Sequence, residues 1–208
     1  MADFKRNGYG QVEPNQLSAQ KTGQIYASLP LDSTVEVLQN GEFMYYDYAT
    51  GKVTCGDDDT VGEPMLVFNE IKLYEPYWQT SYKDFAMIRV GDNYVTSRRA
   101  TEAYGDGALN SGAADPHHTE YGYRMDGIAP RLFKTNIGDI YTTNMVKVGT
   151  GVAYVAGDFL APKRNDETHT LVLEKVADVS AEKGMVWVVA KVYTMPDGQP
   201  GLKIQRVK

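Results

Sequence analysis

After a polar N-terminal stretch, the chain shows short runs of alternating apolar and polar residues separated by turn-forming residues. Residues 34–38 alternate, residues 43–48 form an aromatic run, and residues 53–55 follow after another turn. Asn40 and Gly41 separate the first two runs, and this pair favours a tight hairpin because both residues tolerate positive φ. The pattern therefore predicts a three-stranded antiparallel meander.

The same reasoning predicts further short strands along the rest of the chain. They lie at residues 64–69, 85–90, 140–144, 151–159, 168–176, 185–193 and 202–205. Many short strands with turn signals between them are typical of all-β folds. We therefore predict a mainly β fold, an antiparallel β-sandwich or barrel.

Two segments depart from this pattern. Residues 1–24 are polar and hold too few apolar groups to offset the entropy of ordering, which predicts a flexible, extended N-terminal arm. Such an arm is either a frayed terminus or a segment that orders on a partner. Residues 91–130 are rich in glycine and poor in aliphatic residues, which predicts a long loop excursion that makes contacts elsewhere. Residues 25–208 are then the β-rich domain, and a division near residue 130 stays open.

Composition and charge narrow the class of partner. The 208 residues include 15 tyrosines and 20 glycines, which suits strands and tight turns. The net charge of −6 argues against a general nucleic-acid binder, because such a protein needs a basic surface. The adjacent Arg98 and Arg99 are interpreted as a solvated face or a local contact. We expect no direct nucleic-acid partner.

The sequence also bears on compartment. Cys55 is the only cysteine, so no internal disulfide forms, and we interpret it as a small apolar core residue. The first residues lack the apolar stretch of a signal peptide, and no run reaches the length of a membrane span. We therefore expect synthesis in a reducing cytoplasm and no membrane partner.

Candidate chemistry is sparse. His117 and His118 are adjacent and His169 stands alone, so none has the spacing of a zinc site. The acidic run at residues 57–59 lacks the alternating ligands of a calcium loop and is interpreted as a solvated turn. No nucleophile elbow, phosphate-binding loop or dinucleotide fingerprint occurs. We predict a protein that is not an enzyme and that uses no metal or cofactor. A glycosidase built from two distant carboxylates stays open.

Candidate partner-binding residues come from the polar arm, an aromatic cluster and the arginine pair. They are Gln16, Gln20, Gln24, Tyr74, Tyr77, Trp78, Arg98 and Arg99. The aromatic members suit a protein interface, a core or the face of a sugar equally well.

Three stretches resemble tailed-bacteriophage virion proteins of the auxiliary or decoration type. They read AQKTGQ at residues 19–24, NGEFMYYDY at residues 40–48 and PDGQPGLKI at residues 196–204. The resemblance implies a non-enzymatic structural protein that is made in the host cytoplasm and built into the virion. Its implied partners are the major capsid protein or other virion subunits, and a homo-oligomer is expected on symmetry grounds.

Two other functions compete with capsid decoration. One is a carbohydrate-binding or carbohydrate-cleaving β module, favoured by Trp78 and its neighbouring tyrosines. The other is a tail, connector or internal virion component.

Overall fold

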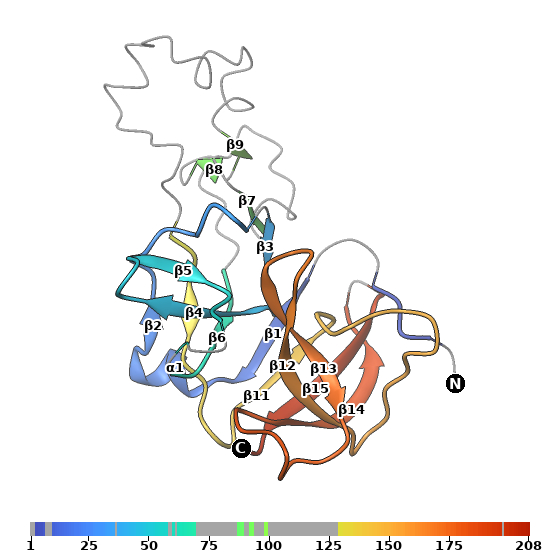
Figure 1. The fold of residues 1–208 in the computed structure, drawn as a ribbon. Helices are drawn as coiled ribbons and strands as arrows, with labels where there is room; N and C mark the ends of the chain where they lie inside the picture. Colours follow the sequence, from blue (N-terminus) through green and yellow to red (C-terminus); the bar gives the residue numbers. More distant parts are fainter. Residues whose placement is uncertain are drawn as a thin grey trace, which may run out of the picture.

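The computed structural model of the chain describes residues 3–6, 10–35, 37–57, 60, 62–69, 87–89, 92–93, 98–99, 129–196 and 198–208. Nearly all regular structure in them is β (Figure 1). The elements are β1 (Val12–Gln16), α1 (Ser18–Thr22), β2 (Ile25–Tyr26), β3 (Val37–Gln39), β4 (Phe43–Asp47), β5 (Lys52–Thr54), β6 (Met65–Val67), β7 (Met87–Arg89), β8 (Asp92–Asn93), β9 (Arg98–Arg99), β10 (Leu132–Phe133), β11 (Ile140–Thr143), β12 (Phe159–Asn165), β13 (Thr170–Val176), β14 (Trp187–Thr194) and β15 (Pro200–Arg206).

One antiparallel sheet joins eleven of these described strands and curls into a half-barrel (Figure 1). Ten strands follow the order β1-β11-β15-β14-β12-β13-β4-β6-β10-β2, and β5 pairs with β4. The pairs β3–β7 and β8–β9 form separate two-stranded sheets. The predicted mainly β, antiparallel fold class is confirmed.

The neighbouring strands β4, β6 and β10 are packed on both faces. Phe43 and Tyr45 of β4 contact one hydrophobic cluster, whereas Met44 and Tyr46 contact a second cluster. This follows from the strand period of two, which sends successive side chains to opposite faces. The sheet is thus covered on both sides at β4, β6 and β10. Packing against the second cluster also fixes the position of Tyr46, which is described below.

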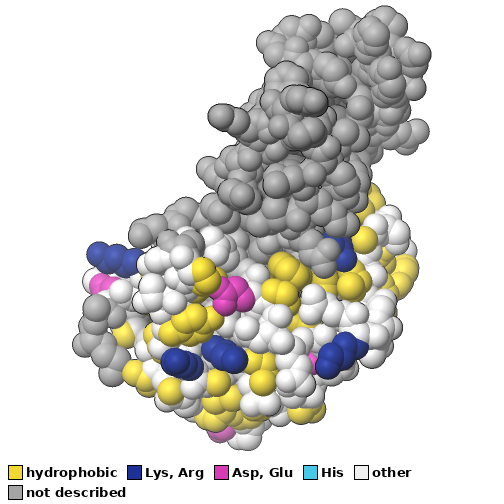
Figure 2. All heavy atoms as spheres, turned by 180° about the vertical axis from the view of Figure 1, so that it is seen from behind, with side chains coloured by type: hydrophobic (Ala, Val, Ile, Leu, Met, Phe, Trp, Pro, Cys, Tyr) yellow, Lys and Arg dark blue, Asp and Glu magenta, His cyan; other side chains and the backbone are white. Residues whose placement is uncertain are grey.

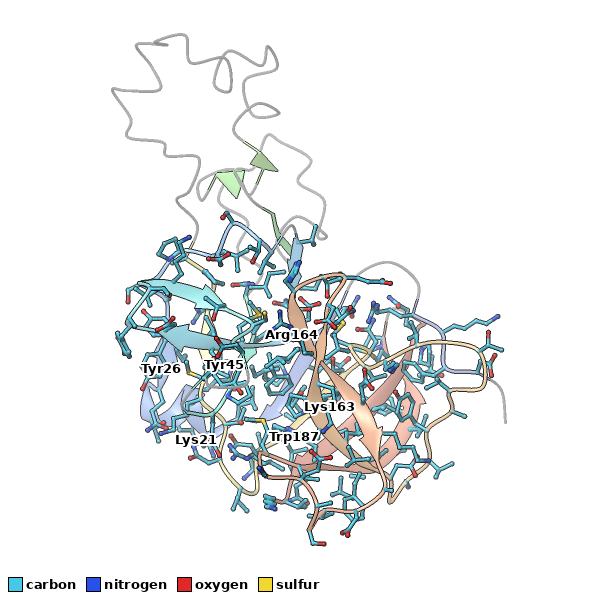
Figure 3. All side chains as sticks on the ribbon, in the orientation of Figure 1. Lys21, Tyr26, Tyr45, Lys163, Arg164 and Trp187 are labelled. Atoms are coloured by element: carbon cyan, nitrogen blue, oxygen red, sulfur yellow. The ribbon has the colours of Figure 1, made fainter. Side chains whose placement is uncertain are left out.

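Trp187 lies at the centre of the larger cluster (Figure 3). Its ring is fully buried, and it meets Tyr141 edge to face at a centroid distance of 5.0 Å. Phe43 lies 6.1 Å away on the neighbouring part of the sheet. Such aromatic contacts hold the β12–β15 region against β4, because large rings bury much apolar area and prefer edge-to-face geometry.

The prediction of an extended N-terminal arm is wrong for residues 10–24. There, β1 pairs with β11, and Leu17 and Ala19 are buried in the larger hydrophobic cluster. Phe4 also packs against Tyr154, with ring centroids 5.4 Å apart. The segment is polar overall, but a few well-placed apolar groups and ladder hydrogen bonds order it.

The turn at Asn40 and Gly41 forms, but the predicted meander does not. The amide of Glu42 bonds the carbonyl of Gln39, and Gly41 has φ of +94°. However, β3 leaves the main sheet and pairs with β7. Its expected place beside β4 is taken by β6, which pairs with Phe43 and Met44. Only the β4–β5 hairpin of the meander is confirmed.

The strand predicted at residues 151–159 is displaced to β12, residues 159–165. Gly157 adopts φ of +93°, which interrupts an extended chain before that point. Pro162 then sits inside β12, where it pairs with Leu173 of β13. Proline fits there because β12 pairs with β14 only at residues 159–160, so the missing N–H leaves no ladder bond unmade on that side.

Most of the predicted excursion at residues 91–130 lies outside the described residues. Within it, β8 pairs with β9, and Pro130 is buried just before β10. The sequence left open a division of the domain near residue 130. Just after this position, β10 pairs with β6 and β2 from the first half of the chain. Among the helices that the structure describes, none is long and apolar enough to cross a membrane.

Candidate functional site

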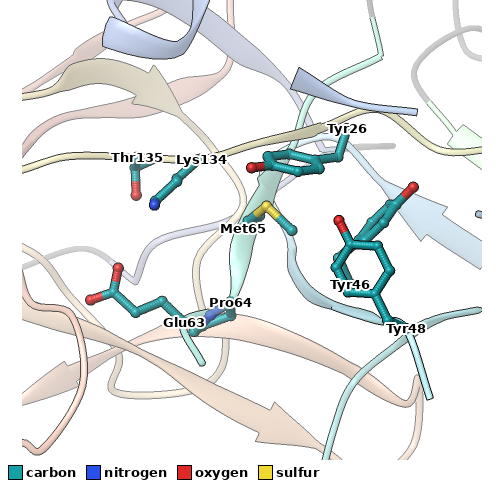
Figure 4. Close-up of a pocket in the computed structure, with 8 residues that line it drawn as sticks. All are labelled: Tyr26, Tyr46, Tyr48, Glu63, Pro64, Met65, Lys134 and Thr135. Atoms are coloured by element: carbon teal, nitrogen blue, oxygen red, sulfur yellow. The ribbon is translucent and has the colours of Figure 1, made fainter. Parts of the chain in front are cut away.

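A pocket of about 390 Å³ opens beside β2, β4 and β6, and we call it the tyrosine pocket (Figure 4). Its lining residues come from strand ends and from the segments that flank them. They are Tyr26, Tyr46, Tyr48, Glu63, Pro64, Met65, Lys134 and Thr135. The volume lies in the range of small-molecule sites, about 300–1,000 Å³. Tyrosines stand on one side and Glu63, Lys134 and Thr135 on the other (Figure 4).

The aromatic side is a chain of three tyrosine rings. The ring centroids of Tyr46 and Tyr26 are 5.4 Å apart. Tyr48 meets Tyr46 edge to face, with a centroid distance of 5.1 Å. The hydroxyl of Tyr46 hydrogen-bonds Oγ of Ser28, which fixes the orientation of the central ring. Tyr48 is 75 % exposed, so one ring of the chain is open to solvent. Tyr46 lies in β4 and Tyr48 lies one residue past its end, and the contact between their rings places both on the same side.

The polar side is held in place from behind by Arg206. This guanidinium is almost fully buried, and its Nη2 bonds Oε1 of Glu63 at 2.7 Å. Its Nη1 bonds the backbone carbonyl and the hydroxyl of Thr135. One arginine therefore positions two of the polar groups that line the tyrosine pocket. Arginine suits this role because its planar group presents several donors in fixed directions.

Electrostatics near the pocket follow from these groups. Burial raises the pKa of Tyr45, and the nearby Glu63 carboxylate raises it further. The lining itself carries one carboxylate, Glu63, and one ammonium, Lys134, so it is formally neutral. Arg206 adds one positive charge behind Glu63. The site therefore offers paired donors and acceptors without a strong net charge.

A second pocket, of about 450 Å³, lies over the turn before β4, and we call it the Glu42 pocket. Glu42 is buried at 2 % exposure. Its Oε2 accepts the amide of Gln39 at 2.7 Å, and its Oε1 accepts the hydroxyl of Thr170 at 3.0 Å. Burial raises its pKa from 4.5 to about 7, although these hydrogen bonds and Arg6 act in the opposite direction. Desolvation wins because the charged form loses more from burial than two hydrogen bonds return.

Arg6 forms part of the same pocket but is not hydrogen-bonded to Glu42. Its Nη1 lies 2.7 Å from Sδ of Met145, a weak acceptor. Burial lowers the pKa of Arg6, and the Glu42 charge partly offsets this. The remaining lining is mixed in charge, with Lys147, Arg164 and Glu174 among its members. This pocket thus holds one carboxylate that titrates near neutrality.

The two pockets differ in what they can do. The tyrosine pocket combines ring faces with fixed polar groups, which suits binding. The Glu42 pocket holds a group that can exchange a proton near pH 7, which suits a pH response. Among the residues that the structure describes, no three His, Cys, Asp or Glu side chains are grouped to hold a metal ion.

The structure describes only some of the residues that were predicted to bind partners. Gln16 on β1 and Gln20 on α1 are exposed, and Gln24 before β2 is half-buried. Arg98 and Arg99 form β9, of which the structure describes the backbone. Tyr74, Tyr77 and Trp78 lie outside the described residues. The structure thus gives the positions of the three glutamines, and partner binding by any of these candidates stays a prediction.

Sequence reasoning missed both pockets. It placed Tyr46 and Tyr48 on an aromatic strand but gave no signal that Tyr26 and Lys134 approach them. It assigned Glu42 to a turn, and a turn glutamate is normally exposed. The one available signal was the aromatic run at residues 43–48, whose alternation implies an outward-facing set of rings.

The chain matches no protein-family model, and no curated protein or solved structure matches it either.

Proposed function

We propose that this chain is a structural virion protein of a tailed bacteriophage that binds the capsid surface through protein–protein contacts. The proposal rests on the resemblance of residues 19–24, 40–48 and 196–204 to decoration-type proteins. In this proposal the partner is the major capsid protein or another virion subunit, the protein has no catalytic role, and it assembles as a homo-oligomer.

The structural observation that supports it most is the edge formed by β1 and α1. Among the described strands, β1 pairs only with β11, so its other edge faces away from the sheet. Gln16 and Gln20 are exposed on this edge. An edge strand offers backbone donors and acceptors to a neighbouring chain, and flanking amides add side-chain hydrogen bonds.

This edge is rigidly anchored to the rest of the domain. The amide and hydroxyl of Ser18, at the start of α1, bond the carboxylate of Asp139 at 3.0 and 2.9 Å. Asn136 donates to the same Ser18 hydroxyl at 2.7 Å. A pre-ordered edge loses less conformational entropy on docking than a flexible arm would.

Charge on the rest of the surface is compatible with protein contacts. On the described part of the face seen from behind, Lys and Arg side chains are spread in small groups, with acidic and hydrophobic side chains between them (Figure 2). In the described part of that face, the basic side chains do not join into one continuous patch of the kind that tracks a nucleic-acid backbone.

The test is co-sedimentation with phage heads that lack this protein. Removing residues 1–24 would be a poor variant, because Leu17 and Ala19 belong to the core. The better variant is the double substitution Gln16→Ala and Gln20→Ala, which changes only exposed side chains. We expect it to bind heads about tenfold more weakly, the effect of losing about 1.4 kcal/mol of contact energy.

The control is Lys183→Ala, which changes an exposed residue in the segment between β13 and β14, outside β1 and α1. It should bind heads as the unsubstituted protein does. Failure of the unsubstituted protein to bind any head preparation would refute the proposal. Binding to tails or connectors in electron micrographs would instead favour a component outside the head shell.

A further inference from the structure

We propose that the tyrosine pocket is a binding site for a neutral sugar, a pyranose ring that lies against Tyr48. This goes beyond the proposed virion function and does not depend on it. It also differs from the carbohydrate hypothesis based on Trp78, because it uses other residues on other elements.

The lining of the pocket is divided into two chemically different sides (Figure 4). Tyr26, Tyr46 and Tyr48 form the aromatic side, and Met65 lies between Tyr26 and Tyr46. A pyranose has one face made mainly of C–H groups and a rim of hydroxyls. Its C–H face matches a tyrosine ring, whose π face is electron-rich.

Tyr48 is the exposed residue of the aromatic side. Its ring stands at 71° to that of Tyr46, so Tyr46 contacts only part of it. At 75 % exposure, Tyr48 is the most exposed large hydrophobic side chain among the described residues. Tyr46, in contrast, is held by Tyr26, Tyr48 and Ser28. The pocket therefore offers the exposed ring of Tyr48, which packs against the fixed ring of Tyr46.

The polar side offers an acceptor and a donor. Glu63 uses Oε1 to bind Arg206, which leaves Oε2 to accept a hydrogen bond. Lys134 is exposed and donates through its ammonium group. An adjacent acceptor and donor match neighbouring hydroxyls on a sugar ring, because each hydroxyl both donates and accepts.

The charges around the pocket distinguish among classes of ligand. Glu63 contributes −1, and Lys134 and Arg206 contribute +1 each, so the three sum to +1. A quaternary ammonium ligand would meet this positive charge and a carboxylate that already has a partner. A phosphate would find only one ammonium in the lining, Lys134, because the guanidinium of Arg206 is buried and already bonded to Glu63 and Thr135. A neutral polyhydroxylated ligand avoids both conflicts.

The experiment uses an array of neutral monosaccharides and oligosaccharides, followed by NMR saturation transfer and calorimetry on hits. The first individual probes are the methyl β-glycosides of glucose and galactose and N-acetylglucosamine. We expect saturation to be strongest at the ring protons of one face, because that face lies on Tyr48.

Two substitutions at one position separate stacking from folding effects. Tyr48→Ala should weaken binding about tenfold, because it removes the ring, whereas Tyr48→Phe keeps the ring and should stay within about twofold. Lys134→Met should weaken binding without changing which face is saturated. Val148→Ala, at an exposed apolar residue outside the pocket, is the control and should change nothing.

A blank array, or equal binding by the unsubstituted protein and Tyr48→Ala, overturns the proposal. If the array is blank and Tyr48→Ala reduces co-sedimentation with heads, the pocket receives a partner side chain instead, which also overturns it. Failure of head binding alone bears only on the virion function, so the two proposals are tested separately.

Discussion

The hydroxyl of Tyr193 donates a 2.7 Å hydrogen bond to Oε2 of Glu13, joining residues 180 positions apart in the chain. The same hydroxyl lies 2.9 Å from Oγ1 of Thr142, which in turn bonds Oδ1 of Asn15. These contacts connect β14, β11 and β1 across one surface. They show that the polar N-terminal segment is fastened by side chains as well as by the sheet.

Tyr193→Phe should loosen β1 while leaving the ring in place. We expect a loss of about 1 kcal/mol in the free energy of unfolding, the usual net value of one such hydrogen bond. Hydrogen exchange should show faster exchange of β1 amides, and urea unfolding should give the stability. Tyr48→Phe, at an exposed ring, is the control; equal effects of both substitutions would contradict the prediction.

Glu42 should make the protein less stable as the pH rises from about 4.5 to about 7. Its pKa is raised to about 7 in the folded chain, so the unfolded chain ionises first and is favoured as the pH rises. The stabilising contribution is complete below the ordinary value of 4.5 and is lost as the pH passes through about 7. The raised pKa corresponds to a change on the order of 3 kcal/mol.

Glu42→Gln tests this directly, because it keeps the shape of the side chain but cannot ionise. As the pH rises from 5 to 7.5, the unsubstituted protein should lose stability relative to the variant. The difference in their free energies of unfolding should change by on the order of 3 kcal/mol. Glu167→Gln, at an exposed turn, serves as control. Parallel pH profiles for the Glu42 variant and the unsubstituted protein would exclude the raised pKa.

Removing the hydroxyl of Tyr141 and removing that of Tyr154 should have different effects on the stability of the protein. The hydroxyl of Tyr141 is buried and has no hydrogen-bond partner among the described residues, whereas that of Tyr154 donates to the carbonyl of Lys147 at 2.7 Å. Tyr141→Phe should therefore be neutral or stabilising by about 1 kcal/mol, because an unpaired buried hydroxyl is costly. Tyr154→Phe should be destabilising by about 1–3 kcal/mol, because a carbonyl loses its partner.

Thermal and urea unfolding of the two variants provide the measurement. Each variant is the control for the other, since both remove one oxygen from a ring that belongs to the same hydrophobic cluster. A clear loss of stability in Tyr141→Phe would mean that its hydroxyl has a partner, such as a buried water.

Gly41 should tolerate alanine less well than Gly51 does. Both have positive φ, +94° and +68°, so alanine strains the backbone at each, by about 1–2 kcal/mol. At Gly41 a Cβ would also lie 2.6 Å from atoms of Met145 and Thr143, whereas at Gly51 it would meet nothing within 4 Å. Gly41→Ala should therefore cost at least about 1 kcal/mol more than Gly51→Ala. Equal losses in urea unfolding would refute the close contact.

Local features of the fold were predictable because they depend on neighbouring residues. The β4–β5 hairpin follows from the aromatic run and from Gly51, and the turn at Gly41 follows from the Asn-Gly pair. The buried strand β6 follows from a short continuous apolar run. In each case the signal and the structure lie within a few residues of each other.

Long-range choices were not predictable from one sequence. β3 and β6 are both short and apolar, and nothing local indicates that β6 rather than β3 pairs with β4. Two apolar residues, Leu17 and Ala19, are too few to predict that a polar segment is buried. They are buried because residues of distant strands pack against them. The tyrosine pocket has the same origin, because the pairing of β10 with β2 places Lys134 and Tyr26 in the lining of one pocket.

The sheet order has a consequence for synthesis on the ribosome. β15 lies between β11 and β14, although it is the last described strand along the chain. Until residues 200–206 are available, β11 and β14 cannot be connected, so the β1–β11 pair stays separate from the rest of the sheet. Such distant pairing delays folding until most of the chain has left the exit tunnel. Deleting residues 200–206 should therefore leave one edge each of β11 and β14 unpaired and divide the sheet in two.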